Sequence, residues 1–258
     1  MLRFSMTLIA FSVFAFSSSA SLIADGLIKK IPKDGPWATY AVETTITHED
    51  GSQTSSNGTL TVRSVGTTII DDTTCRWLEF ELSWQQEVTV KIPRGFHSSV
   101  TKIAIPESAF LKNADSAQEI RAGFSAKTSS DVKRKEWNYP RVREVVAGRG
   151  SSSGYGVLDQ YVRAPFGQAT QIADKTIEVG GKAFNCSGLE HSETTHKLGA
   201  SRNTVTTTDF RQWANDKTPF GTVRYHFERL RMNGEGFSQE LTLEATGSNA
   251  KTSLPSVK

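Results

Sequence analysis

This sequence of 258 residues contains little cysteine, has a small net charge and lacks the common cofactor-binding motifs. It contains two cysteines and five histidines, too few and too scattered for a cysteine-rich metal site. The formal net charge of +3 is too small to indicate a polyanionic partner by itself, and we expect no nucleic acid partner. No Walker loop and no dinucleotide-binding fingerprint occurs. We therefore expect neither a cofactor nor a metal.

Long apolar runs are also missing, except near the N-terminus. Residues 8–16 are mostly apolar and follow Arg3, which is typical of a secretory signal peptide. The run is shorter than the ~20 residues that span a bilayer, and no cysteine follows it to carry a lipid anchor. Ala20 and Ala24 are alternative cleavage positions. We expect residues 1–24 to be a signal peptide and the protein to be periplasmic or extracellular, with no transmembrane span after cleavage.

The two cysteines, Cys75 and Cys186, admit only one pairing. A disulfide between them is one interpretation in an oxidising compartment, where it would close a loop of roughly a hundred residues and contribute about 4–5 kcal/mol in the chain-entropy model. The alternative is two buried thiols that pack as small hydrophobic side chains. The disulfide is the prediction that the structure can test.

What the sequence has in quantity is alternation of apolar and polar residues, the pattern of half-buried β-strands. The alternation is clearest over residues 78–84, and it recurs over residues 37–47, 222–228 and 241–246. The pair Gly180-Gly181 between two such stretches predicts a hairpin with a two-residue turn. One apolar and one polar face per strand is typical of antiparallel sheets.

The middle of the chain has a different character. Ser116 and Glu119 form a capping box, and apolar residues at helical spacing follow them, which predicts a short helix over residues 116–125. We place it in a helical insert at about 113–147, and a flexible Gly/Ser loop follows at 148–156.

The predicted fold class is therefore mainly β (β-rich α+β), with a curved antiparallel sheet or half-barrel and a short helical insert. We expect a single β-rich domain over residues 25–247 and a disordered polar tail over residues 248–258. A sandwich, or two subdomains hinged at the Gly/Ser loop, is the alternative arrangement.

The stretch from Trp213 to Val223 runs from a strand-ending tryptophan through a turn and Pro219-Phe220-Gly221 to the start of a strand. Together with Cys75-Arg76-Trp77-Leu78-Glu79 and Ile105-Pro106-Glu107, this stretch resembles uncharacterised exported bacterial proteins with a lipoprotein-carrier-type half-barrel. In that fold a curved antiparallel sheet wraps around short helices. Carriers of that type shield acyl chains inside the half-barrel, so the resemblance implies an apolar or lipid-like ligand.

Two short patterns could carry chemistry. Residues 150–154 read Gly-Ser-Ser-Ser-Gly and match the Gly-x-Ser-x-Gly nucleophile elbow, which would make Ser152 the nucleophile of an exported hydrolase. The elbow needs a strand before it and a helix after it, and a flexible loop is expected here instead. His191 and His196 are five residues apart, a spacing that fits neither a helical nor a strand pair of metal ligands.

A basic patch lies beside aromatic residues in the stretch 127–149. Basic side chains next to aromatic ones can hold anionic polymers or lipid head groups, and in an exported protein the partner would be an envelope component. The alternative is a solvated helix face. The patch consists of Lys133, Arg134, Lys135, Arg141 and Arg143.

The main functional hypothesis is an exported non-catalytic protein that binds a lipid-like small molecule in the curve of its sheet. Such a site requires an open cavity, because ligand pockets are concave and mostly apolar. The alternative is that the same apolar strand faces pack together as a closed core. The contacts expected in the ligand site are Trp84, Tyr225, Phe227 and Leu243.

Overall fold

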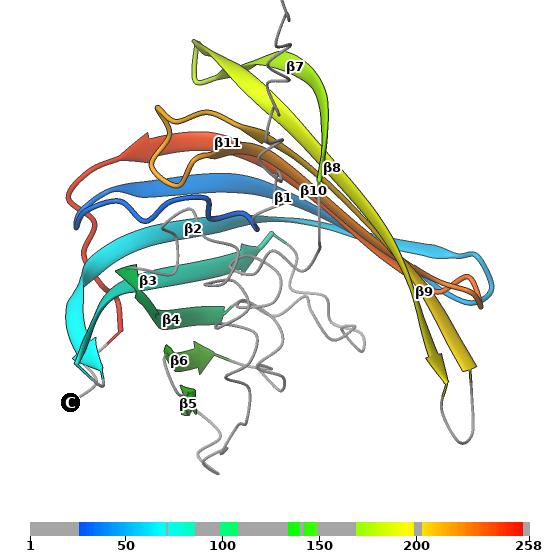
Figure 1. The fold of residues 1–258 in the computed structure, drawn as a ribbon, viewed down its shortest axis with the longest axis horizontal. Helices are drawn as coiled ribbons and strands as arrows, with labels where there is room; N and C mark the ends of the chain where they lie inside the picture. The colour runs from blue at the N-terminus through cyan, green and yellow to red at the C-terminus, as the bar shows by residue number, and fades with distance from the viewer. Residues whose placement is uncertain are drawn as a thin grey trace, which may run out of the picture.

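The computed structural model describes residues 26–70, 72–85, 99–107, 134–139, 142–148, 169–198 and 203–254. All the elements of regular structure in these residues are β-strands, and they join in one antiparallel sheet of eleven strands (Figure 1). The predicted mainly β fold with a curved antiparallel sheet is thus confirmed. Within the same residues, no helix has the length and apolar character needed to cross a membrane.

The strands pair in the order β5-β6-β4-β3-β2-β1-β11-β10-β9-β8-β7. Most neighbours in the sheet are also neighbours in the chain, and the first and last strands pair with each other near the middle. The strands are β1 (Trp37–Thr47), β2 (Gln53–Ile70), β3 (Thr73–Trp84), β4 (Ser99–Pro106), β5 (Arg134–Tyr139), β6 (Val142–Gly148), β7 (Thr170–Val179), β8 (Lys182–Leu198), β9 (Asn203–Ala214), β10 (Thr222–Arg231) and β11 (Gly236–Gly247).

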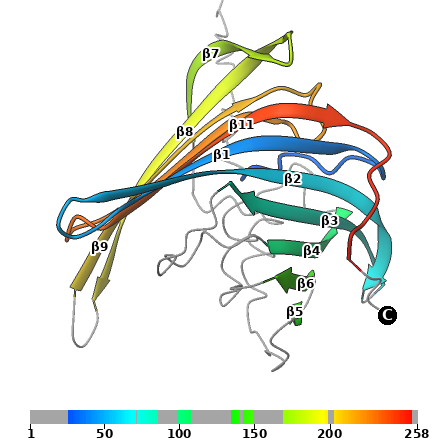
Figure 2. The same cartoon turned by 180° about the vertical axis from the view of Figure 1, so that it is seen from behind.

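The sheet is open and strongly curved, so that it has the shape of part of a barrel (Figures 1 and 2). The right-handed twist between neighbouring strands accumulates over the eleven strands and produces this curvature. β7 curls back toward β11. A Cβ atom added at Gly180, in the turn after β7, would lie 3.8 Å from the Glu244 carbonyl oxygen of β11.

One face of the sheet carries the main core. Successive side chains of a strand point to opposite faces, so the buried positions alternate with more exposed ones. Leu78 and Phe80 of β3 are almost fully buried, as are Tyr225 of β10 and Leu241 of β11. The alternation predicted from the sequence is confirmed in β10 and β11. In β3, in contrast, the residues from Trp77 to Phe80 are all buried, so both faces of that strand are covered there.

The C-terminal segment is held against the opposite face of the sheet. Glu79 of β3 is fully buried there, and its carboxylate accepts hydrogen bonds from Thr252 Oγ1 at 2.7 Å and from Ser253 Oγ at 3.0 Å. The Ser253 N–H also donates to it at 3.1 Å, and Arg63 donates at 3.3 Å. The described part of the tail expected to be disordered at 248–258 is therefore anchored by a buried carboxylate.

The predicted disulfide is wrong. Cys75 lies in β3 and Cys186 in β8, and five strands separate β3 from β8 in the sheet. A disulfide requires Cα atoms within about 7 Å of each other. Each step from one strand to the next adds about 4.8 Å, so strands with five others between them are too far apart along the sheet. Both cysteines are buried and no disulfide joins them, which agrees with the alternative of two packed thiols.

The structure also differs from the helical insert expected at 113–147, in the second half of that range. β5 and β6 form an antiparallel hairpin there, next to β4. Valine and aromatic residues favour strands, and Pro140 between the two strands opposes a continuous helix. The helix predicted over 116–125 and most of the loop at 148–156 lie outside the described residues.

Candidate functional site

The four residues expected to bind a lipid-like ligand belong to one buried cluster. Trp84 is 9% exposed, Phe227 6%, Leu243 2% and Tyr225 1%. The Tyr225 ring packs edge-on against the Phe210 ring, with 5.2 Å between the ring centroids. The structure therefore brings the four residues onto one face of the sheet, but none of them lines either of two cavities that described residues form at the β7 edge.

The basic patch is described only in part. Arg134 and Lys135 lie in β5 and Arg143 in β6, where Arg143 pairs with Asn138 across the hairpin. Lys133 and Arg141 lie outside the described residues, as does Ser152 of the nucleophile-elbow pattern. The hypotheses of an anionic polymer site and of a hydrolase therefore stay predictions.

The two histidines considered as metal ligands lie in a strand rather than a loop. β8 continues to Leu198, so His191 pairs with Phe210 and His196 pairs with Val205 of β9. The β8–β9 ladder extends this far because β-branched threonines favour strands, and Thr194 and Thr195 of β8 pair with Thr207 and Thr206 of β9. Among the described residues, no group of three or more His, Cys, Asp or Glu side chains is placed to hold a metal ion.

Two adjoining cavities lie along the β7 edge of the sheet, and both are lined by Asp174 and Lys175. We call the two together the edge groove. The larger cavity has a volume of about 670 Å³ and the smaller about 370 Å³. The larger is lined by Lys29, Asp174, Lys175, Thr176, Asn185, Cys186, Ser187, Ala214, Asn215, Asp216 and Lys217. The smaller is lined by Ile172, Ala173, Asp174, Lys175, Glu190, Arg211 and Trp213.

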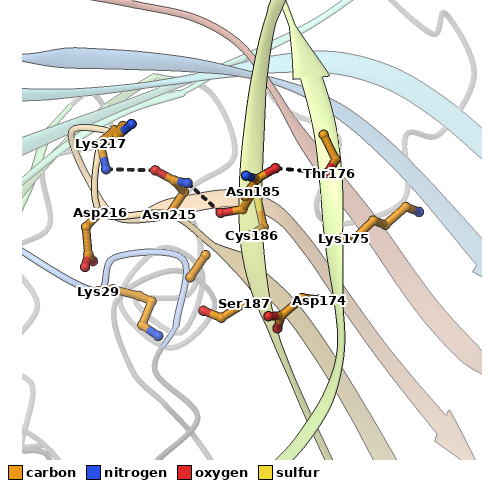
Figure 3. A pocket seen from close by; sticks show the side chains of 11 residues that line it. Lys29, Asp174, Lys175, Thr176, Asn185, Cys186, Ser187, Asn215, Asp216 and Lys217 are labelled. Carbon is orange, nitrogen blue, oxygen red and sulfur yellow. Dashed lines mark hydrogen bonds between the residues drawn. The ribbon is translucent and has the colours of Figure 1, made fainter.

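A bulge in β7 opens the groove. The pairing of β7 with β8 shifts register between Ile172 and Lys175, so the intervening residues leave the regular ladder. Bulges bend an edge strand and redirect its side chains. In Figure 3, Asp174 and Lys175 of this strand lie on one side of the larger cavity, while Lys29 lies on the other.

The opposite wall is the turn between β9 and β10, which Asn215 organises. Its side-chain amide donates to the Asn185 carbonyl of β8 at 2.6 Å, and its side-chain oxygen accepts from the Lys217 N–H at 2.9 Å (Figure 3). The Asn215 N–H donates to the Gly221 carbonyl at 2.9 Å. Asn and Gly favour such turns, which is why the sequence predicts this turn correctly.

Several charged side chains of the larger cavity lack an ion-pair partner. Among the described residues, Lys29, Lys175 and Lys217 form no ion pair with a carboxylate, and neither Asp174 nor Asp216 pairs with a basic side chain. Most arginines of the described sheet, in contrast, are paired with carboxylates. The larger cavity therefore presents hydrogen-bond donors and acceptors that no described side chain uses.

Trp213 gives the smaller cavity its apolar surface. It lies directly opposite Gly188 of β8, and a Cβ atom at that glycine would be 3.2 Å from the indole nitrogen. The Lys175 ammonium and the Arg224 guanidinium each lie 5.6 Å from the centre of the Trp213 ring. Cations at this distance from an aromatic ring are attracted to it, which fixes the side chains around the indole.

Cys186 lines the larger cavity without offering a reactive group. Its side chain is 1% exposed, and its thiol donates a weak hydrogen bond to the Phe184 carbonyl at 3.3 Å. Burial raises the pKa of the Cys186 thiol to about 11. Because the thiolate is the nucleophilic form, this cysteine is unreactive at neutral pH.

Of the residues that line the edge groove, only Cys186 is a site residue predicted from the sequence. The useful signal was Asp174-Lys175 in the middle of an otherwise alternating strand, because charged neighbours at that point break the period of two. The meeting of Lys29 with residues 215–217 depends on tertiary structure and has no local signature.

Comparison with known proteins gives similarity of structure only. No protein-family model matches the chain, and no curated protein matches it. A Bacteroides fragilis protein, provisionally named as exported and with a YmcC-like fold, is 12% identical, with a TM-score of 0.36 over 86% of this chain and 99% of its own. A Parabacteroides distasonis protein, provisionally named a lipoprotein, is 9% identical, with a TM-score of 0.35 over 87% of this chain and 100% of its own.

Proposed function

We propose that the protein is an exported, non-catalytic binding protein whose edge groove takes a neutral, hydroxyl-rich ligand such as an oligosaccharide chain. The observation that carries the proposal is the set of charged side chains in the groove that form no ion pair within the described part of the chain. A sugar hydroxyl both donates and accepts hydrogen bonds, so it can satisfy ammonium groups and carboxylates together.

The charge balance of the groove supports a neutral ligand over a strongly charged one. Its two linings contain four cations against three carboxylates, so the groove has little net charge. The cations are Lys29, Lys175, Arg211 and Lys217, and the carboxylates are Asp174, Glu190 and Asp216.

The smaller cavity adds an apolar surface to these polar groups. Trp213 and Ile172 can contact the apolar ring faces of a sugar, while polar side chains bind its hydroxyls. Ligand sites generally combine apolar surface with a few placed polar groups. The N-terminal signal-peptide pattern supports export, and glycans of the cell envelope are hydroxyl-rich partners in that compartment.

The test is a calorimetric titration of the mature protein with chitohexaose, with maltohexaose as a second neutral probe and heparin as a polyanion. We expect a neutral probe to bind with an affinity that changes little when salt rises from about 50 to about 500 mM. Asp174→Ala and Lys29→Ala should each lower that affinity about tenfold, because each removes hydrogen bonds made by a charged group.

Lys182→Ala is the matched control, because Lys182 is an exposed lysine of β8 that lines neither cavity. Its affinity should equal that of the wild type. Failure of both neutral probes to bind, or equal binding by all the variants, would contradict the proposal. Binding of heparin alone, weakened by salt, would favour the basic patch around Arg134 and Arg143 as the site of an anionic envelope polymer.

The competing proposal is a lipid-like ligand on the face of the sheet that carries the main core. Trp84, Tyr225, Phe227 and Leu243 share one face of the curved sheet, which supports it. Their burial supports the closed core instead. The substitution Leu243→Trp separates these two interpretations.

A further inference from the structure

The N-terminal segment 26–30 is fastened to the strands and turn that form one wall of the edge groove. The buried Gln212 side chain of β9 donates to the Gly26 carbonyl at 2.9 Å. Three residues further on, the Lys29 N–H donates to the Phe220 carbonyl, also at 2.9 Å. Two hydrogen bonds that involve the backbone of the segment thus fix its path past the turn.

Side chains of the same segment hold it on both sides. Leu27 and Ile28 are fully buried in the main core. The Lys30 ammonium donates to the Asp216 carbonyl in the turn between β9 and β10. Lys29, between these anchors, is the only residue of the segment that lines the edge groove.

Gly221 is in direct contact with Lys29. Its φ of +85° lies in the left-handed region, and a Cβ atom added there would be 2.9 Å from the Lys29 Cβ. Real Cβ atoms do not approach this closely, so a side chain at 221 would displace Lys29. Gly221 itself lines neither cavity.

We infer that the N-terminal segment is a wall of the edge groove whose docking decides ligand affinity, and that Gly221 is the positioning residue that places Lys29 in the groove. The inference rests on the proposed function of the groove. It adds that the site is incomplete until residues 26–30 have docked. Ligand binding and docking then stabilise each other, because coupling between two binding events is reciprocal.

The test compares two glycines with nearly the same positive φ. Gly234 has a φ of +87°, and the nearest atom to a Cβ atom added there is 4.0 Å away. Gly234→Ala therefore reproduces the backbone strain of Gly221→Ala without the contact to Lys29. We expect Gly221→Ala to lower the chitohexaose affinity about tenfold and Gly234→Ala to leave it unchanged.

A double-mutant cycle shows whether the effect passes through Lys29. In a Lys29→Ala background, Gly221→Ala should change the chitohexaose affinity little further, because the side chain that it displaces is already absent. If Gly221→Ala does not fold, Lys30→Ala provides a second variant without backbone strain. It should weaken binding, and chitohexaose should protect the wild-type segment 26–30 from aminopeptidase.

The outcomes separate this inference from the proposed function. If Asp174→Ala weakens chitohexaose binding while Lys29→Ala and Gly221→Ala do not, the groove binds the ligand and the inference about the segment is wrong. Equal losses of affinity in Gly221→Ala and Gly234→Ala also overturn it, because backbone strain then explains both. Absence of binding by the wild type removes the proposed function and the inference together.

Discussion

Gly58 of β2 lies directly opposite Trp84 of β3, and a Cβ atom added at Gly58 would come within 2.7 Å of the Trp84 ring. The same arrangement occurs at two other places, where Trp37 faces Gly247 and Trp213 faces Gly188. A glycine within a strand is unfavourable by itself, and an aromatic side chain laid across it from the next strand restores packing.

This relationship predicts the effect of Gly58→Ala. The new methyl group would collide with the Ser83 carbonyl oxygen as well as with the Trp84 ring. We therefore expect a loss of about 1–3 kcal/mol in the free energy of unfolding, typical of an overpacked core. Urea unfolding followed by circular dichroism measures it. Gly236→Ala is the control, because its Cβ atom would meet no atom closer than 3.3 Å, the end of the Leu230 side chain. Equal stability of the two variants would contradict the packing argument.

Leu243→Trp tests whether the side chains on the main-core face of the sheet form a closed core. Leu243 is 2% exposed within the main cluster, so a larger side chain should overpack it and lower stability by about 1–3 kcal/mol. We expect no saturable binding of a fluorescent fatty acid by the wild type. Wild-type binding that is lost in a Leu243→Trp protein of unchanged stability would establish the lipid-like ligand and contradict the closed core.

The strands were predictable because their signal is local. Residues 78–84 and 222–228 alternate apolar and polar side chains, and the alternation alone determines which side chains share a face. The half-barrel shape followed from a resemblance, and the structure shows it. Local patterns could not show that β1 pairs with β11, because that pairing joins the two ends of the chain.

The wrong disulfide and the missed site have a common cause in contacts between distant residues. Cys75 and Cys186 looked like a pair because two cysteines admit one bridge, yet the strand order places five strands between them. Lys29 entered no prediction because its partner Phe220 is far along the chain. The edge groove is built from such contacts, so sequence patterns predicted its turn but not the site.

The C-terminal anchor gives a third prediction. Three donor groups of Thr252 and Ser253, two hydroxyls and one N–H, donate hydrogen bonds to the fully buried Glu79 carboxylate. Glu79→Gln removes the charge that strengthens these bonds, so it should lower stability by about 1–3 kcal/mol and expose the tail to carboxypeptidase. Lys251→Ala, at an exposed position of the same segment, should do neither. A tail equally protected in Glu79→Gln would show that Glu79 is not its anchor.

The arrangement of the cysteines predicts two reactive thiols after denaturation. In urea without a reductant, alkylation with iodoacetamide should add two labels, because no disulfide joins Cys75 and Cys186. In the folded protein at about pH 8, Cys186 should label slowly, since little of a thiol with a raised pKa is thiolate. Mass spectrometry counts the labels. An unreduced, denatured protein that takes up none would restore the disulfide.

Burial of Cys186 also predicts how stability changes with pH. Burial raises the pKa of its thiol from 9.0 to about 11, so the folded state holds the thiol proton over a pH range in which the unfolded state releases it. The stabilisation linked to this proton is complete below the unfolded pKa and is lost as the pH rises through the folded pKa. The stability advantage of the wild type over Cys186→Ala should therefore shrink between about pH 9 and about pH 11. Urea unfolding of both proteins across this range measures the difference, and a constant difference would show that the thiol ionises equally easily in the folded and unfolded states.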